Sequence, residues 1–186
     1  GIKISIRLND SVIYHSHSDF GVSDLEFNFL VHHIAKCGLS CFVIGGTGSG
    51  KTTFNNLLIK HIDDNQLINV IGDIHDYIFF GEQKVSEITA KKDEDYIKGF
   101  DLLMRSNPDR ILVPELSVGN VNLILRALNS GHKGFMLTMH AGDVDGGVAN
   151  AFVKNLALSG VEVKPAEVEK DINSNVDFLL HLHKND

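Results

Sequence analysis

Cysteine and proline are both scarce in this chain of 186 residues, which has two cysteines and three prolines. Two cysteines, Cys37 and Cys41, are too few for the disulfide framework of a small secreted domain or for a four-cysteine zinc site. We expect both to be buried as small apolar residues. With 43% hydrophobic residues, the chain is typical of one globular domain with its own core rather than of a disordered or fibrous protein.

Long apolar runs and an excess of positive charge are missing as well. No stretch of about 18 apolar residues occurs, so the sequence predicts no membrane-spanning helix. Acidic residues outnumber basic ones by 24 to 17, for a net charge of −7, so we expect no direct DNA binding by this chain. The first residues lack the basic and then apolar pattern of a signal peptide. These features predict a cytoplasmic protein.

Short apolar runs alternate with amphipathic stretches along the chain, without internal repeats. The apolar runs predict buried strands at 40–44, 67–71, 110–113, 135–139 and 176–182, and an alternating pattern predicts a further strand at 2–8. Helices are expected at 23–38, which opens with a capping box, and around 54–62, 93–104, 118–128 and 144–156. This order predicts an α/β domain with a mainly parallel sheet, helices on both faces and ligands beyond the carboxyl ends of the strands.

The most specific motif follows the strand at 40–44. The segment from Gly45 to Thr52 reads Gly-Gly-Thr-Gly-Ser-Gly-Lys-Thr and satisfies G-x-x-x-x-G-K-[ST], the phosphate-binding P-loop. Its glycines allow backbone N–H groups to surround a phosphate, and the start of the next helix adds a partial positive charge. Lys51 is expected to reach the β- and γ-phosphates and Thr52 to bind Mg²⁺. A plain glycine-rich turn is the alternative, but the preceding strand and following helix favour the P-loop.

Carboxylates follow two of the predicted strands. Glu115 comes after the strand at 110–113, and Asp73 and Asp76 come after the strand at 67–71. A carboxylate at the end of a strand near the P-loop is suited to organising the metal or the attacking water. The simpler interpretations are a surface glutamate and an aspartate-rich turn.

Histidines provide weaker signals. His132 and His140 flank the strand at 135–139 and are candidate sensors of the γ-phosphate, unless they are ordinary structural histidines. The pairs His15/His17 and His181/His183 have no cluster of acids or cysteines to complete a metal site.

The motifs, taken in order, resemble the traffic ATPases of the type II/type IV secretion superfamily, most of all its conjugative-transfer (type IV secretion) branch. Residues 46–53 match the Walker A motif of that family, 71–77 resemble its Asp box, 104–115 match its Walker B segment, and 129–134 with 138–141 resemble its His box. The resemblance implies a RecA-like P-loop NTPase core over 23–186. It also implies that 1–22 is the strand segment that joins this core to an N-terminal domain missing from the chain.

The same resemblance assigns roles to individual residues, with ATP and Mg²⁺ as ligands. The residues expected to bind the nucleotide are Gly46, Thr47, Gly48, Ser49, Gly50, Lys51, Thr52 and Thr53. Arg105 is a further candidate near a subunit contact. Glu115, Asp76, His140 and His132 are the expected catalytic residues. Thr52, Glu115 and Asp73 are the expected Mg²⁺ ligands.

Three departures from the usual family pattern involve four positions. Gly72 and Asp76 stand where the Asp box usually has glutamates, Pro114 stands where a glycine usually precedes the Walker B glutamate, and Ser117 replaces an arginine. The altered Asp box leaves open a nucleotide-gated scaffold that scarcely hydrolyses ATP. A pilus or type II secretion motor also shares these motifs. A RecA-like DNA helicase would share the P-loop, but the acidic charge and the His box disfavour it.

The resemblance also implies an assembly. The full-length protein is expected to form a homo-hexameric ring that powers macromolecule export or pilus assembly. Its expected place is the cytoplasmic side of the bacterial inner membrane, with inner-membrane components of a secretion system as partners.

Overall fold

The computed structural model describes residues 16–72, 77–79, 81–89, 93–141 and 146–183 of the chain. The strand predicted at 2–8, and with it most of the expected joining segment, lies outside these residues. Among the residues described, no helix is both long and apolar enough to cross a bilayer.

Within the described residues, six strands form one sheet in the order β3-β2-β4-β5-β1-β6. Their bounds are Cys41–Gly45 (β1), Leu67–Gly72 (β2), Lys84–Thr89 (β3), Arg110–Val113 (β4), Phe135–Met139 (β5) and Phe178–Leu182 (β6). All neighbouring pairs are parallel. The carboxyl ends of all six strands therefore lie at the same end of the sheet. An open α/β sheet binds its ligands at this end.

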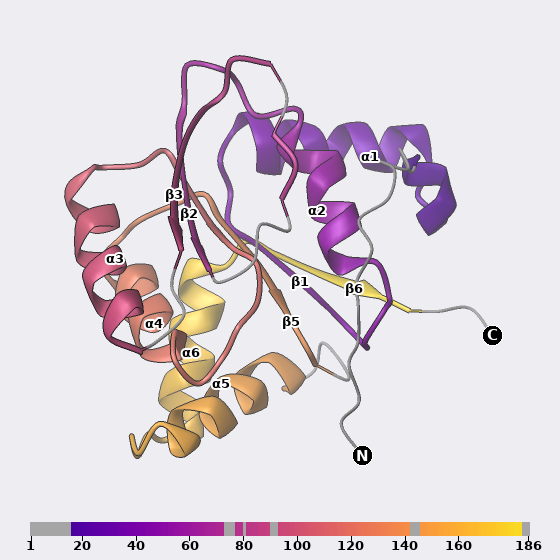
Figure 1. Ribbon diagram of the computed structural model, residues 1–186. Coiled ribbons are helices and arrows are strands. Elements are labelled where there is room, and N and C mark those ends of the chain that lie inside the picture. Colours follow the sequence, from indigo (N-terminus) through magenta and orange to yellow (C-terminus); the bar gives the residue numbers. More distant parts are fainter. Residues whose placement is uncertain (1–15, 73–76, 80, 90–92, 142–145, 184–186) are drawn as a thin grey trace, which may run out of the picture.

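Helices cover both faces of the sheet, as predicted (Figure 1). One face carries η1 (His17–Phe20), α1 (Asp24–Leu30), η2 (Val31–Lys36) and α2 (Lys51–Ile59). The other face carries α3 (Asp93–Arg105), α4 (Val121–Asn129), α5 (Gly147–Leu158) and α6 (Pro165–Asn175).

Strand β1 shows how the two cores form. Phe42 and Ile44 pack in the core beside α3 to α6, whereas Cys41 and Val43 pack in the core beside α2. Successive side chains of a strand point to opposite faces. A strand covered on both faces is therefore apolar throughout, which explains why its sequence shows no alternation.

Three elements escaped the sequence prediction: β3, α6 and the short η1, which lies within the expected joining segment 1–22. Strand β3 lies at the edge of the sheet, and its exposed Lys84, Ser86 and Glu87 resemble a loop in sequence. Helix α6 begins with a proline, is mostly polar and buries only Val168 and Ile172.

The prediction for the cysteines is half right. Cys41 is buried, and burial raises the pKa of its thiol, whereas Cys37 is exposed. The Cys37 sulfur lies 3.7 Å from Nε2 of His32. Cys37 follows the last turn of η2 rather than lying on its buried side, which is formed by Ile34 and Ala35.

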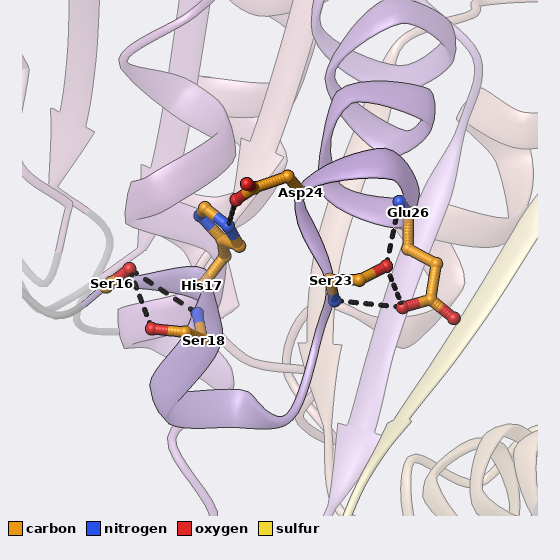
Figure 2. Close-up of polar contacts among 6 residues, drawn as sticks. All are labelled: Ser16, His17, Ser18, Ser23, Asp24 and Glu26. Atoms are coloured by element: carbon orange, nitrogen blue, oxygen red, sulfur yellow. Dashed lines mark hydrogen bonds and ion pairs between the residues drawn. The ribbon is translucent and has the colours of Figure 1, made fainter.

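Side-chain caps order the segment before β1, and Figure 2 shows them. The Ser23 hydroxyl accepts a hydrogen bond from the Glu26 N–H at 3.3 Å, and the Glu26 carboxylate accepts one from the Ser23 N–H at 2.9 Å. This confirms the predicted capping box. The bonds from Ser23 hold the pKa of Glu26 below its ordinary value. Nε2 of His17 lies 2.8 Å from Oδ1 of Asp24, which connects η1 to the start of α1.

Replacing Ser23 with alanine should therefore destabilise the fold. The change leaves the Glu26 N–H in the first turn of α1 without its cap, which typically costs about 1 kcal/mol. Chemical denaturation of Ser23→Ala measures this loss, and Ser86→Ala on the exposed edge strand is the control with little expected effect. Equal stability of the two variants would show that the cap does not order α1.

Candidate functional site

The predicted P-loop joins the carboxyl end of β1 to the start of α2. Gly45 ends the strand and Lys51 is the first residue of the helix. Gly50 has a φ of +89°, and a Cβ atom at that position would lie 2.7 Å from the Phe20 ring. Both the turn and the packing of η1 therefore require glycine there. Phe20 is a part of this environment that the sequence did not reveal.

Lys51 is enclosed by the loop that precedes it. Its side chain is buried, and Nζ donates hydrogen bonds to the carbonyl oxygens of Gly45 at 3.0 Å and Gly46 at 2.9 Å. Burial lowers the pKa of Lys51, and the nearby charge of Glu115 partly opposes that shift. The arrangement holds the Lys51 ammonium group at the carboxyl end of β1 with little water around it.

The remaining loop residues fit a phosphate group. Thr52 and Thr53 lie half-buried in the first turn of α2, where helix N–H groups have no partner within the helix. The Ser49 hydroxyl is buried, and none of the described residues offers it a hydrogen bond. A loop with a buried cation and unsatisfied donors is suited to an anion.

Glu115 and His140 meet at the carboxyl ends of the strands, where the P-loop also lies. Glu115 follows β4, His140 follows β5, and Oε1 of Glu115 lies 3.2 Å from Nε2 of His140. Both side chains are about half exposed. The structure thus brings together three residues predicted from different motifs, Lys51, Glu115 and His140.

A hydrogen-bond network beneath Glu115 fixes its backbone. Asn120 Nδ2 donates to the Glu115 carbonyl at 2.8 Å, and Asn120 Oδ1 accepts the Ser117 N–H at 2.8 Å. The buried Thr138 hydroxyl donates to the Pro114 carbonyl. Neither Asn120 nor Thr138 was predicted as a site residue. Thr138 lies in the segment that resembles the His box, whereas the single amide of Asn120 carries no distinctive pattern.

The structure describes only part of the Asp box. Asp73 and Asp76 lie outside the described residues, so their predicted roles remain predictions. Tyr77, directly after them, is buried, and its hydroxyl donates to the Val113 carbonyl at 3.1 Å. Asn55 of α2 donates to the same Tyr77 oxygen at 3.4 Å. This tyrosine ties the end of the Asp box to β4 and to the P-loop helix.

Two predicted site residues lie near the amino ends of the strands, away from the end of the sheet that carries the P-loop. Arg105 ends α3, shortly before β4 begins, and His132 lies shortly before β5, with Nδ1 2.9 Å from the Ser130 hydroxyl. In a parallel sheet the helix returns the chain to the amino end of the next strand, so residues just before a strand lie away from the ligand edge. The structure does not bring either residue to the P-loop, and their roles stay predictions.

Two of the departures from the family pattern touch one another. Gly72 ends β2, and Pro114 follows the neighbouring strand β4. A Cβ atom at Gly72 would lie 3.0 Å from both Cγ and Cδ of Pro114. The proline ring therefore occupies the space that a side chain at position 72 would need.

Comparison with known proteins settles the family. The family described as "Type II/IV secretion system protein" matches residues 1–173. The chain belongs to this family. The predicted membership is thereby confirmed.

The matched relatives include proteins of the type IV branch, as predicted. The chain is 36% identical over 124 residues to the type IV secretion system protein VirB11 of Bartonella quintana, covering 64% of this chain and 35% of that protein. It is 29% identical over 150 residues to the conjugal transfer protein TrbB of Rhizobium radiobacter, covering 78% of this chain and 44% of that protein. The chain thus spans between a third and a half of these relatives.

A solved structure confirms the predicted RecA-like fold. The VirB11 ATPase of Brucella suis, crystallised in complex with sulphate, superposes with a TM-score of 0.71 at 20% sequence identity. The match covers 86% of this chain and 47% of that one.

Replacing Lys51 with alanine tests the P-loop. The variant lacks the cation placed to meet the β- and γ-phosphates, so ATP affinity should fall by about 1.4 kcal/mol or more, a factor of ten. Isothermal titration calorimetry measures the loss, and Lys60→Ala, an exposed lysine at the end of the same helix, is the matched control. Unchanged affinity in Lys51→Ala would contradict the P-loop assignment.

A double-mutant cycle tests the contact between Gly72 and Pro114. Gly72→Ala alone should destabilise the fold by about 1–3 kcal/mol, because the new methyl group meets the proline ring. In Pro114→Ala only Cβ remains, at 3.8 Å from the added carbon, so the same change should be tolerated. Denaturant unfolding of the unmodified protein, the two single variants and the double variant should give a coupling free energy of about 0.5–3 kcal/mol between the two positions. Strict additivity would show that the two positions are independent.

Proposed function

We propose that this chain is the ATP-binding and ATP-hydrolysing motor domain of a secretion or conjugative-transfer ATPase. The observation that carries the proposal is the buried ammonium group of Lys51 inside a P-loop, close to the Glu115 carboxylate at the end of a nearby strand. Membership of the secretion family supports it.

The loop and Lys51 bind the phosphates. The ammonium group donates to two carbonyl oxygens of its own loop, and phosphate oxygens would replace these weaker acceptors. Because Lys51 is buried, little water screens its charge, which strengthens the interaction. Such a fixed cation would also stabilise the charge that develops on the transferred phosphoryl group.

Glu115 and His140 act beside the terminal phosphate. The Glu115 carboxylate would accept a hydrogen bond from the attacking water or from water on the metal, and His140, 3.2 Å away, would hold it in place from β5. Mg²⁺, when bound, neutralises charge on the phosphates, with Thr52, Glu115 and Asp73 as its proposed ligands. One or two carboxylates together with phosphate oxygens are the usual environment of this ion. Asp76 is the proposed general base.

The proposed assembly is a homo-hexamer of the full-length protein that works with inner-membrane components of a secretion system, on the cytoplasmic side. The names of the matched relatives, which include type IV secretion and conjugal transfer proteins, support this role. Arg105 and His132 lie away from the P-loop of their own chain, so Arg105 is proposed to act at a contact between subunits and His132 to act through β5.

The second candidate is a nucleotide-gated scaffold with little hydrolysis. Position 72 favours it, because Pro114 fills the space beside Gly72 and no carboxylate stands there. The two functions share the binding site and differ only in turnover.

Substitution of single carboxylates separates these functions. Glu115→Gln keeps the shape and removes the charge, so nucleotide binding should survive while turnover falls about a hundredfold or more. Asp76→Asn should also slow turnover if Asp76 is the base. Release of phosphate by the full-length protein measures both rates, and Glu162→Gln, an exposed loop residue, is the control.

Each outcome has a distinct meaning. Normal turnover in Asp76→Asn would move the base to Glu115. Turnover that is negligible in the unmodified protein, with ATP binding intact, would favour the scaffold. Normal turnover in Glu115→Gln would contradict the proposed mechanism.

A further inference from the structure

We propose that His181 and His183, at the end of β6, form the platform on which the base of the bound nucleotide lies. The inference deepens the proposed function and rests on it, since it needs the phosphates to occupy the P-loop. It assigns a role to a histidine pair that the sequence offered only as an incomplete metal site.

A hollow of about 560 Å³ joins the P-loop to these histidines. The loop backbone from Gly45 to Thr47 lines it, together with His140 from the end of β5 and His181 and His183 from the end of β6. Its volume falls within the usual range of small-molecule sites. The hollow therefore continues beyond the phosphate-binding loop, on the side where β6 lies.

The order of the strands gives the nucleotide a direction. Glu115 and His140 follow β4 and β5, which lie on one side of β1, whereas β6 lies on the other side. The terminal phosphate must face Lys51 and Glu115 for hydrolysis to occur. The sugar and base must then extend away from them, and the hollow leads toward β6.

Strand β6 is held firmly against the loop. Leu182 is paired with Gly45, and a Cβ atom at Gly45 would lie 2.5 Å from the Leu182 carbonyl oxygen. The absence of a side chain at Gly45 thus lets the two backbones approach closely. The flanking residues His181 and His183 are consequently fixed relative to the P-loop.

The two imidazole rings make a combined aromatic surface. Alternate residues of a strand point to the same face, and the ring centroids of His181 and His183 lie 3.7 Å apart with an interplanar angle of 46°. Stacking on an aromatic side chain tolerates any base, because every base has a π face. Among the described residues, no group of three or more His, Cys, Asp or Glu side chains is placed to hold a metal ion.

Two probes distinguish a base platform from a phosphate site. ATP and inorganic tripolyphosphate share the phosphates, and only ATP has a base. In the double variant His181→Ala/His183→Ala, ATP affinity should fall about tenfold while tripolyphosphate affinity stays within about twofold. The variant His181→Phe/His183→Phe keeps the aromatic faces and should bind ATP nearly as well as the unmodified protein.

Controls separate this inference from the proposed function. Lys51→Ala should weaken both probes, and His32→Ala, an exposed histidine of η2, should weaken neither. Circular dichroism checks that each variant is folded. Unchanged ATP affinity in the alanine variant, or an equal loss for both probes, would overturn the platform while leaving the P-loop function intact. Failure of the unmodified protein to bind either probe would instead overturn the proposed function.

Discussion

The enclosure of one ammonium group at the end of β1 is the constraint on which the rest of the site depends. Lys51 acts strongly on a phosphate only if water is kept away from it, yet the same burial disfavours its charge and lowers its pKa. Two loop carbonyls and the charge of Glu115 stabilise the ammonium group. The glycines that allow the loop to fold back on Lys51 also allow close packing by Phe20 at one end and by Leu182 at the other.

The strand order explains why the proposed catalytic groups stand apart from the loop. Strand β5 separates β1 from β4, and with strands spaced by about 4.8 Å, Glu115 starts roughly 10 Å from the loop strand. That gap suits a terminal phosphate and a water molecule. His140, at the end of the intervening strand, lies within 3.2 Å of Glu115. Short polar contacts from Asn120 and Thr138 then fix the turn that carries Glu115.

Much of this arrangement was predictable, because apolar strands and the P-loop have distinctive local patterns. The strands at 110–113 and 135–139 were predicted with the bounds observed, since each is buried on both faces. Strand β3 and helix α6 were missed because their polar faces look like loops in sequence. Motif membership alone did not show that Arg105 and His132 lie just before β4 and β5, because the βαβ connection decides at which end of a strand a residue lies. The contact between Gly72 and Pro114 joins two positions far apart in sequence, and no local pattern predicts it.

The titration of Lys51 tests most directly whether an enclosed ammonium group holds the phosphates. Nuclear magnetic resonance of the lysine Cε carbons, with the Lys51 signal assigned by its loss in Lys51→Met, gives the pKa of this group with and without ATP. We expect a pKa below the ordinary lysine value in the free protein and a rise when ATP binds, because phosphate favours the ammonium form. A Lys51 pKa at its ordinary value, or one unmoved by saturating ATP, would contradict this role of the enclosed lysine.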